Sequence, residues 1–274
     1  MSKETPKLSI ITVCYNNCEG LRKTMESVKT QTFKDYEYIV IDGGSTDGTV
    51  ELIKENEQHI DYWVSEKDSG IYNAMNKGIE AAKGKYCYFL NSDDYIAVPN
   101  TLEKIFEQVK GNPDIIYGNL AVRKGDKLCY VVNFSKNITP YSFYRFKPAI
   151  HHQASFSKKE LFQEYGNYDE EKKINADWFF FFQMTVLHKV KIQYINQIFA
   201  VFLADGMSSS NNNDALRTQE VRNIKKETFL KYLQPKQLKK YENMKRLTDS
   251  FFVGKIQKVK NKLFLIKAKL KKEI

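Results

Sequence analysis

The stretch YCYFLNSDDY, residues 86–95, decides how this chain of 274 residues can fold. Five mostly apolar residues with no helical spacing run directly into the polar run Asn91–Asp94, which predicts a buried strand that ends in two adjacent carboxylates. In open α/β sheets, ligands bind at the carboxyl ends of the strands. The stretch therefore predicts a ligand site at one edge of a sheet.

Strand and helix patterns alternate on both sides of this stretch. Strands are predicted over 8–13, 36–42, 61–66, 86–90 and 114–119, and helices over 19–30, 49–58, 70–84 and 99–110, the last with Pro99 in its first turn. This order predicts an α/β fold with a Rossmann-like, mostly parallel sheet flanked by helices. Three of these strands end in polar loops, at 14–17, 42–45 and 91–94, on the same edge of the sheet.

The composition predicts a reduced, cytoplasmic protein with a substantial core. Hydrophobic residues make up 42% of the chain, with 18 Phe and 17 Tyr, which excludes a disordered chain. Cys14 and Cys87 lie inside apolar strand runs, so the four cysteines do not resemble a disulfide set. The N-terminus has no signal-peptide pattern, and no apolar run is long enough to predict a membrane-spanning helix.

The net charge of +10 is distributed unevenly along the chain. Residues 215–274 carry 18 Lys and Arg against 5 Asp and Glu, whereas the other 214 residues carry 25 against 28. Within this basic tail, apolar residues at helical spacing predict an amphipathic helix with a stripe of Phe252, Ile256, Val259, Leu263, Ile266 and Leu270. Such a helix can rest on an anionic membrane, form a coiled-coil homodimer or pack back on the body. The basic residues lie on this tail instead of on an aromatic-studded sheet, which argues against a nucleic-acid partner.

The adjacent carboxylates of Asp93 and Asp94 have two readings. They would repel one another at a semi-buried strand end, and a divalent cation such as Mg²⁺ or Mn²⁺ would remove that conflict. Alternatively, they cap the helix that follows. Asp42 also has two readings, since it can accept hydrogen bonds from a nucleobase or ribose, or form an Asx-turn before Gly43 and Gly44.

Taken together, three segments resemble the family 2 inverting glycosyltransferases with a GT-A fold. They are ITVCYNN (11–17), IVIDGGSTDGT (39–49) and SEKDSGIYNAMNKGIEAAKGKYCYFLNSDD (65–94). The resemblance is closest to bacterial enzymes of capsule, O-antigen and exopolysaccharide assembly. It covers residues 8–120 and, more loosely, 148–210, and it does not cover the tail.

The resemblance implies roles for the residues of the three loops. Tyr15 and Asn16 line the nucleotide site, Asp42 contacts the base, and Asp68 is another contact on the nucleotide side. The DxD motif of the family falls on Asn91-Ser92-Asp93, so Asn91 and Ser92 belong to the nucleotide site. Asp93 is the implied ligand of Mn²⁺ or Mg²⁺. The sequence departs from the motif at Asn91, which offers no charge. Asp94 and Lys77 are further candidate residues of the site, without an assigned role.

In the second half, a hairpin is predicted through Lys124-Gly125-Asp126, a strand over 149–156 and a helix over 158–165. The resemblance continues here in His152-Gln153, the turn GNYDE (166–170) and Ala176-Asp177. It implies that Asp177 is the base that deprotonates the acceptor; the alternative is a first-turn acid favoured by the helix dipole.

His152 could assist the metal or the diphosphate, or be purely structural. Because adjacent residues of a strand point to opposite faces, at most one of His151 and His152 is expected to face the site. The polar stretch 204–214 fits a lid over the donor or a plain surface loop.

The implied function is transfer of a sugar, with inversion, from a UDP-hexose or UDP-N-acetylhexosamine to a saccharide acceptor, in the form of a lipid-linked oligosaccharide. The implied division is a glycosyltransferase domain over 1–214, with a nucleotide-sugar half over 1–120 and an acceptor half over 121–214, followed by the basic tail. A location on the cytoplasmic face of the inner membrane follows from the tail. The alternatives are a catalytically silent nucleotide-sugar-binding protein and, more weakly, a nucleic-acid-binding protein.

Overall fold

The computed structural model describes residues 5–125, 127–144 and 149–204, together with residues 219, 220, 223, 224, 236, 239 and 240. Asp126 of the predicted turn, the predicted lid after Ala204 and the apolar stripe of the tail lie outside the described residues. Within the described residues, no helix is both long and apolar enough to cross a membrane.

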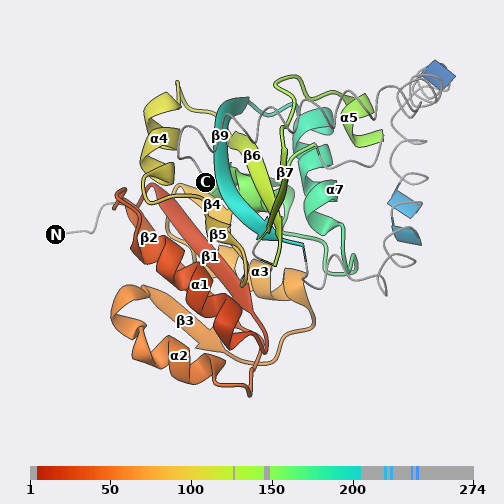
Figure 1. The fold of residues 1–274 in the computed structure, drawn as a ribbon. Helices are drawn as coiled ribbons and strands as arrows, with labels where there is room; N and C mark the ends of the chain where they lie inside the picture. The colour runs from red at the N-terminus through yellow and green to blue at the C-terminus, as the bar shows by residue number, and fades with distance from the viewer. Residues whose placement is uncertain are drawn as a thin grey trace.

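Within the described part of the chain, nine strands form one sheet in the order β3-β2-β1-β4-β8-β6-β9-β5, with β7 paired to β6 (Figure 1). The strands are β1 (Leu8–Cys14), β2 (Tyr36–Asp42), β3 (Tyr62–Ser65), β4 (Tyr86–Phe89), β5 (Tyr95–Ile96), β6 (Ile115–Lys124), β7 (Lys127–Val132), β8 (Ser155–Lys158) and β9 (Ile192–Leu203).

The sheet is parallel where the predicted β-α-β rhythm is regular. β1 pairs in parallel with β2 and β4, and β2 with β3. β1 is buried along its whole length, as expected for a strand covered on both faces. Beyond β4 the pairing is mixed, since β8 runs antiparallel to β4 and β6 while β9 runs parallel to β6. The predicted α/β class is confirmed.

Helices flank this sheet (Figure 1). They are α1 (Cys18–Lys29), α2 (Thr49–Glu55), α3 (Ile71–Ala81), α4 (Thr101–Gln108), α5 (Pro140–Tyr144), α6 (Lys159–Tyr165) and α7 (Ala176–Phe182). α3 packs on β1 and β2, and α4 packs on β9. The apolar face predicted for α1 is confirmed, because Leu21, Met25 and Val28 are buried.

Several predicted boundaries are wrong: the strand predicted over 114–119 continues as β6 to Lys124, and the helices predicted over 49–58 and 70–84 end at Glu55 and Ala81. Pro99 does not occupy the first turn of α4, because Asn100 is the N-cap and the helix begins at Thr101. The predicted strand over 149–156 begins only at Ser155, where pairing with β4 and β6 starts. The preceding residues His152–Ala154 form a 3₁₀ turn, in which the Ala154 N–H donates to the His151 carbonyl at 3.0 Å.

Candidate active site

The polar loops after β1, β2 and β4 meet at the carboxyl edge of the sheet. The Asn16 N–H donates to Ser45 Oγ at 2.7 Å, and the Thr46 N–H donates to Asn16 Oδ1 at 2.9 Å, so the first and second loops are joined. The Ser92 N–H donates to the Val13 carbonyl at 3.1 Å, which joins the third loop to the first. The structure thus brings together the strand-end residues that the sequence singled out.

Asp42 is fully buried at the end of β2 and shapes the loop that follows. Its Oδ2 accepts from the N–H groups of Gly44 and Ser45 at 3.2 and 2.9 Å and from Ser65 Oγ at 2.6 Å. Its Oδ1 accepts from the Ser45 hydroxyl and, at 3.6 Å, from Cys14 Sγ. Burial, followed by the nearby Asp42 charge, raises the pKa of the Cys14 thiol. The Asx-turn reading of Asp42 is therefore realised in this conformation.

Tyr15 and Asp68 approach the same loop at Gly43. Asp68 Oδ2 lies 2.6 Å, and the Tyr15 ring 3.3 Å, from the position that a Cβ on Gly43 would occupy. A side chain at this position would force the Asp68 carboxylate to move. Lys77 Nζ forms an ion pair of 2.8 Å with Glu66, two residues before Asp68 in the chain, and so links α3 to the segment that carries Asp68.

Asp93 leans toward the start of α1. Its φ of +79° is in the left-handed region, which costs a non-glycine residue about 1 kcal/mol. Asn17 Nδ2 donates to Asp93 Oδ2 at 2.6 Å, while Asn17 Oδ1 caps α1 by accepting from the Gly20 N–H at 3.1 Å. Asp93 Oδ1 lies 2.5 Å from the position that a Cβ on Gly20 would occupy, so a side chain there would displace the Asp93 and Asn17 side chains. Such strain is typical of functional loops.

Asp94 has different surroundings from its neighbour Asp93. It is 4% exposed, and its backbone carbonyl accepts from Thr24 Oγ1 at 2.7 Å. Burial raises the pKa of Asp94 to about 7, although a hydrogen bond from the Gln153 side chain and one from the Leu203 backbone oppose the shift. The carboxylates therefore do not form one shared site. The capping alternative is wrong for both, because α4 is the next helix and Asn100 is its N-cap.

A chain of contacts joins the end of β4 to the start of α7. Asn91 Nδ2 lies 3.3 Å from His152 Nε2, and His152 Nδ1 lies 2.8 Å from Asp177 Oδ2. The single hydroxyl proton of Tyr72, on α3, is shared between two acceptors, the Ile174 carbonyl at 2.6 Å and Asp177 Oδ1 at 3.0 Å. Because a carboxylate only accepts, His152 Nδ1 is the donor in its contact with Asp177.

Asp177 is ionised in this environment. Burial alone would raise the pKa of its carboxyl group, but the hydrogen bond from His152, assisted by Tyr72, holds the pKa below its ordinary value. The side chains of His152 and Asp177 are 13% and 16% exposed, so a substrate can still reach them. Asp177 lies in the first turn of α7, as the alternative reading supposed, yet both its oxygens contact other elements.

His151 is separate from this chain. Its ring lies 5.4 Å from the ring of Phe134, and burial lowers its pKa to about 4. Only His152 of the two contacts Asn91 and Asp177 among the described residues. The two histidines have different surroundings, but strand alternation is not the reason, because His152 begins a 3₁₀ turn and β8 starts only at Ser155.

The fit of a divalent cation depends on Asp93 and Asn91. Among the described residues, no group of three or more His, Cys, Asp or Glu could hold a metal. Asn91 Oδ1 is buried and has no hydrogen-bond partner within the same part of the chain. One carboxylate and one free amide oxygen suit Mg²⁺ or Mn²⁺ when substrate phosphates supply the other ligands. The residues present fit that shared mode of binding.

The sequence did not indicate the partners of two residues of the site, although Asn17 lies in the polar loop predicted over 14–17. Tyr72 lies in the recognised GIY segment and Asn17 follows Asn16, but nothing local indicates that they contact Asp177 and Asp93. Their partners are 105 and 76 positions away in the chain.

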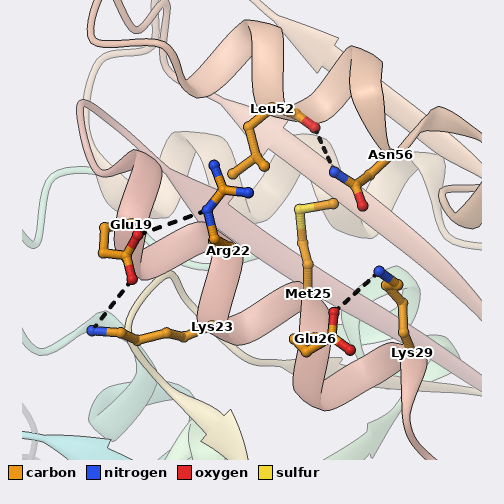
Figure 2. A pocket seen from close by; sticks show the side chains of 8 residues that line it. All are labelled: Glu19, Arg22, Lys23, Met25, Glu26, Lys29, Leu52 and Asn56. Carbon is orange, nitrogen blue, oxygen red and sulfur yellow. Dashed lines mark hydrogen bonds and ion pairs between the residues drawn. The ribbon is translucent and has the colours of Figure 1, made fainter.

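Figure 2 shows a different hollow, between α1 and α2. Lys29 pairs with Glu26 at 3.1 Å, and Glu19 lies 3.7 Å from Arg22 and 3.9 Å from Lys23. Because these charges pair with one another, the hollow offers no unpaired group for a ligand, and the candidate site stays at the sheet edge. It is lined by Glu19, Arg22, Lys23, Met25, Glu26, Lys29, Leu52 and Asn56.

Comparison with protein families matches residues 9–189 to the family described as "Glycosyl transferase family 2". The chain is 35% identical over 178 residues to an uncharacterized glycosyltransferase of Mycobacterium tuberculosis, covering 63% of this chain and 66% of that protein. It is 30% identical over 181 residues to a PGL/p-HBAD biosynthesis glycosyltransferase of Mycobacterium bovis, covering 64% of this chain and 68% of that protein.

Solved structures share the fold at low sequence identity. S. aureus TarS in complex with UDP-GlcNAc has a TM-score of 0.56 at 20% identity, covering 72% of this chain and 58% of that one. The mannosyltransferase PcManGT from Pyrobaculum calidifontis, in complex with GDP-Man and Mn²⁺, has a TM-score of 0.56 at 16% identity, covering 96% and 81%. The structures support the GT-A fold that the sequence predicted.

Proposed function

Since the chain belongs to glycosyl transferase family 2, we propose that it moves a sugar from a nucleotide-sugar donor to a saccharide acceptor, with inversion at the anomeric carbon. The donor is a UDP-hexose or UDP-N-acetylhexosamine, and a structural neighbour bound to UDP-GlcNAc supports that class. The acceptor is a lipid-linked saccharide of surface polysaccharide or glycolipid assembly. A relative assigned to PGL/p-HBAD biosynthesis is consistent with such an acceptor.

In this proposal the strand-end loops hold the nucleotide. Tyr15, Asn16 and Asp68 surround the Gly43 loop and would contact the nucleoside. The Asp42 carboxylate already accepts hydrogen bonds from the loop after β2 and from Ser65. Asp42 would therefore help to bind the nucleobase mainly by fixing the shape of that loop. Ser92, which accepts from Asn17 Nδ2 at 3.3 Å, lies on the ribose and diphosphate side.

Asp93 and the free amide oxygen of Asn91 would hold a divalent cation, Mn²⁺ or Mg²⁺, together with the diphosphate of the donor. A structural neighbour in complex with GDP-Man and Mn²⁺ supports the choice of ion. When bound, the cation would neutralise the charge that develops on the departing diphosphate. His152 would steady Asn91 from the other side, through the contact of 3.3 Å between them.

Asp177 would act as the base. The acceptor hydroxyl loses its proton to the Asp177 carboxylate as its oxygen bonds to the anomeric carbon. The bond from that carbon to the diphosphate oxygen breaks, and the nucleoside diphosphate leaves with the electron pair. Because the pKa of Asp177 lies below its ordinary value, the carboxylate is ready to accept a proton at neutral pH. Each oxygen still has a lone pair beside its Tyr72 or His152 partner.

The observation that carries this proposal is the contact between His152 and Asp177. It ties the ionised carboxylate on α7 to Asn91 at the end of β4, where the donor diphosphate is expected. A base and a leaving group must be held in a fixed relation for an in-line displacement, and this chain of contacts supplies one.

The test is the variant Asp177→Asn, assayed by release of nucleoside diphosphate from UDP-glucose, UDP-GlcNAc and GDP-mannose, with and without saccharide acceptors. Removal of the base should lower kcat by about 10²- to 10⁴-fold and leave nucleotide affinity unchanged. The control Glu171→Gln neutralises an exposed carboxylate in the loop that leads into α7, and it should retain normal turnover. Wild-type rates in Asp177→Asn would contradict the assignment. Nucleotide binding without turnover in the wild type would favour the catalytically silent alternative.

We further propose that residues 1–214 form the catalytic domain and that the basic tail, 215–274, contacts anionic lipid at the cytoplasmic membrane face. The excess of Lys and Arg in the tail supports this, since each basic residue near such a surface contributes about 1 kcal/mol. The full chain should co-sediment with phosphatidylglycerol vesicles and not with phosphatidylcholine vesicles. If the chain co-sediments with neither kind of vesicle and has the mass of a dimer in solution, the coiled-coil alternative would be indicated instead.

A further inference from the structure

Glu220 contacts the loop that leads into α7, although it lies well beyond the family match at residue 189. Its Oε1 accepts from the Lys173 N–H at 2.6 Å. Its Oε2 accepts from the Ile174 N–H at 3.1 Å and from Asn175 Nδ2 at 3.0 Å. The carboxylate of one residue therefore binds three consecutive residues of this loop. Hydrogen bonds to a charged acceptor are among the stronger ones in proteins.

The segment around Glu220 is anchored on the body. Gln219, Glu220, Asn223 and Ile224 are helical, and Ile224 is 2% exposed within the main core. Gln219 and Asn223 are exposed and bond only to each other among the described residues, at 3.0 Å. Glu220 and Ile224 are four residues apart, so they lie on one helix face, which is directed at the body.

The loop held by Glu220 is also held from its other side, by Tyr72. The Tyr72 hydroxyl lies 2.6 Å from the Ile174 carbonyl and 3.0 Å from Asp177 Oδ1. The peptide groups of Ile174 are thus fixed by Glu220 through the N–H and by Tyr72 through the carbonyl. Any shift of this loop would move Asp177 relative to both Tyr72 and His152.

Local contacts hold residues 169–172 of this loop, as in the Lys172 N–H that donates to the Asp169 carbonyl at 3.2 Å, whereas the N–H groups of Lys173 and Ile174 donate to Glu220. Asn175 is the N-cap residue of α7, yet within the described residues its side chain does not cap the helix and instead donates to Glu220. The approach to Asp177 is therefore defined by a carboxylate that comes from the C-terminal segment.

We propose that Glu220 is a positioning residue for Asp177, and that the catalytic domain extends past residue 214 to include the described residues Gln219, Glu220, Asn223 and Ile224, so that only the chain beyond them is left for lipid contact. This inference rests on the proposed role of Asp177 as the base. Glu220 does not touch the substrate; it acts by holding residues 173–175, and through Ile174 and Tyr72 it fixes the Asp177 carboxylate.

Hydrogen exchange in the full-length chain tests the structural half of this proposal without a substrate. In Glu220→Ala, amides in peptides that cover residues 171–178 should exchange about tenfold faster or more, while peptides from β1 and β2 stay unchanged. Glu220→Gln, which keeps one acceptor, should lie between the wild type and Glu220→Ala. The matched control Gln219→Ala should exchange like the wild type. Unchanged exchange over 171–178 in Glu220→Ala would overturn the proposal.

Kinetics test the functional half and separate it from the proposed base. Glu220→Ala should lower kcat by about 10- to 100-fold with the donor KM within about twofold, because a misplaced base affects chemistry more than binding. In an Asp177→Asn background, Glu220→Ala should have no further effect. A normal kcat in Glu220→Ala with an inactive Asp177→Asn would refute only the positioning role. Normal turnover in Asp177→Asn would refute the base itself.

Discussion

The two halves of this site are held in different ways. At the donor edge, contacts are made largely within a loop or to the adjacent strand, as in Asp42 with Gly44 and Ser45. In the acceptor half, Asp177 depends on Tyr72, 105 positions away, and its loop depends on Glu220, which is 46 positions from Ile174. The donor edge therefore forms where the ends of adjacent parallel strands meet, even for partners as far apart in the chain as Asn17 and Asp93, whereas Asp177, the proposed base, is held by contacts from α3 and from the C-terminal segment. Substitutions should accordingly separate nucleotide binding from turnover.

The largest effect on stability is expected at the donor edge, from Asp42→Ala. This change removes a buried carboxylate and leaves the N–H groups of Gly44 and Ser45 without their acceptor. We expect a loss of about 3 kcal/mol in the free energy of unfolding, with weaker nucleotide binding, measured by urea denaturation and titration calorimetry. Asp35→Ala, which removes a carboxylate that bonds the exposed Lys7 N–H, is the control. A stable Asp42→Ala protein with intact affinity would show that the loop does not depend on this turn.

The acceptor half should also set the response to mild acid, through His151. Its folded-state pKa of about 4 lies below the ordinary value of 6.5, so between these values the unfolded chain binds a proton that the folded chain does not. The stability that His151 contributes should therefore fall by about 2 kcal/mol between pH 7 and 5, while Asp94, with its pKa raised to about 7, shifts the stability in the opposite direction over the same range. His151→Asn should lose less than the wild type over that range. The exposed donor-half control His59→Asn should follow the wild type; identical pH profiles for all three proteins would contradict the assignment.

A smaller effect is expected from removing the contact between Tyr72 on α3 and Asp177 on α7, which links the two halves of the site. Tyr72→Phe keeps the ring against Tyr168, 5.6 Å away, but removes the hydroxyl that reaches Ile174 and Asp177. We expect kcat to fall about tenfold, with a loss of stability of about 1 kcal/mol and little change in donor KM. Tyr62→Phe, at a tyrosine that is 46% exposed, is the matched control. A raised donor KM with normal kcat would place Tyr72 in binding instead.

The smallest effect is expected at the hollow between α1 and α2. Lys29→Ala breaks an ion pair with Glu26 whose side chains are 27% and 63% exposed. Such exposed pairs contribute little, so we expect a change in stability of less than about 0.5 kcal/mol and no change in turnover. A marked loss of turnover in this variant would mean that the hollow takes part in function.

The sequence predicted the donor half well because its signals are local. The apolar runs over 8–13 and 36–42 became β1 and β2, and the polar residues that follow them gather at one sheet edge. A run of buried β-branched residues indicates a strand wherever it lies in the chain. Asp93 and Asn91 were located by their place after such a run.

The acceptor half resisted prediction because its shape depends on pairing between distant segments. Residues 149–156 have a strand-like composition, but the chain turns at His152–Ala154 and pairs only from Ser155 onward. β9 was not predicted. Its pairing with β6 shifts register around Asn119, so the two strands do not pair regularly along their length. Asp177 was located by resemblance, whereas no local signal pointed to Tyr72, which contacts it, or to Glu220, which contacts the loop before it.

The central claim is that the strand-end loops bind a nucleoside diphosphate together with a divalent cation held by Asp93. The most direct measurement is the melting temperature with UDP, GDP or dTDP, each with and without Mn²⁺, for the wild type, Asp93→Ala and the exposed-charge control Glu19→Ala. Ligand at about 100 times its Kd should stabilise the native state by about 2.7 kcal/mol. We predict a shift with one nucleotide that requires Mn²⁺, persists in Glu19→Ala and disappears in Asp93→Ala. No shift with any nucleotide, or a full shift in Asp93→Ala, would contradict the claim.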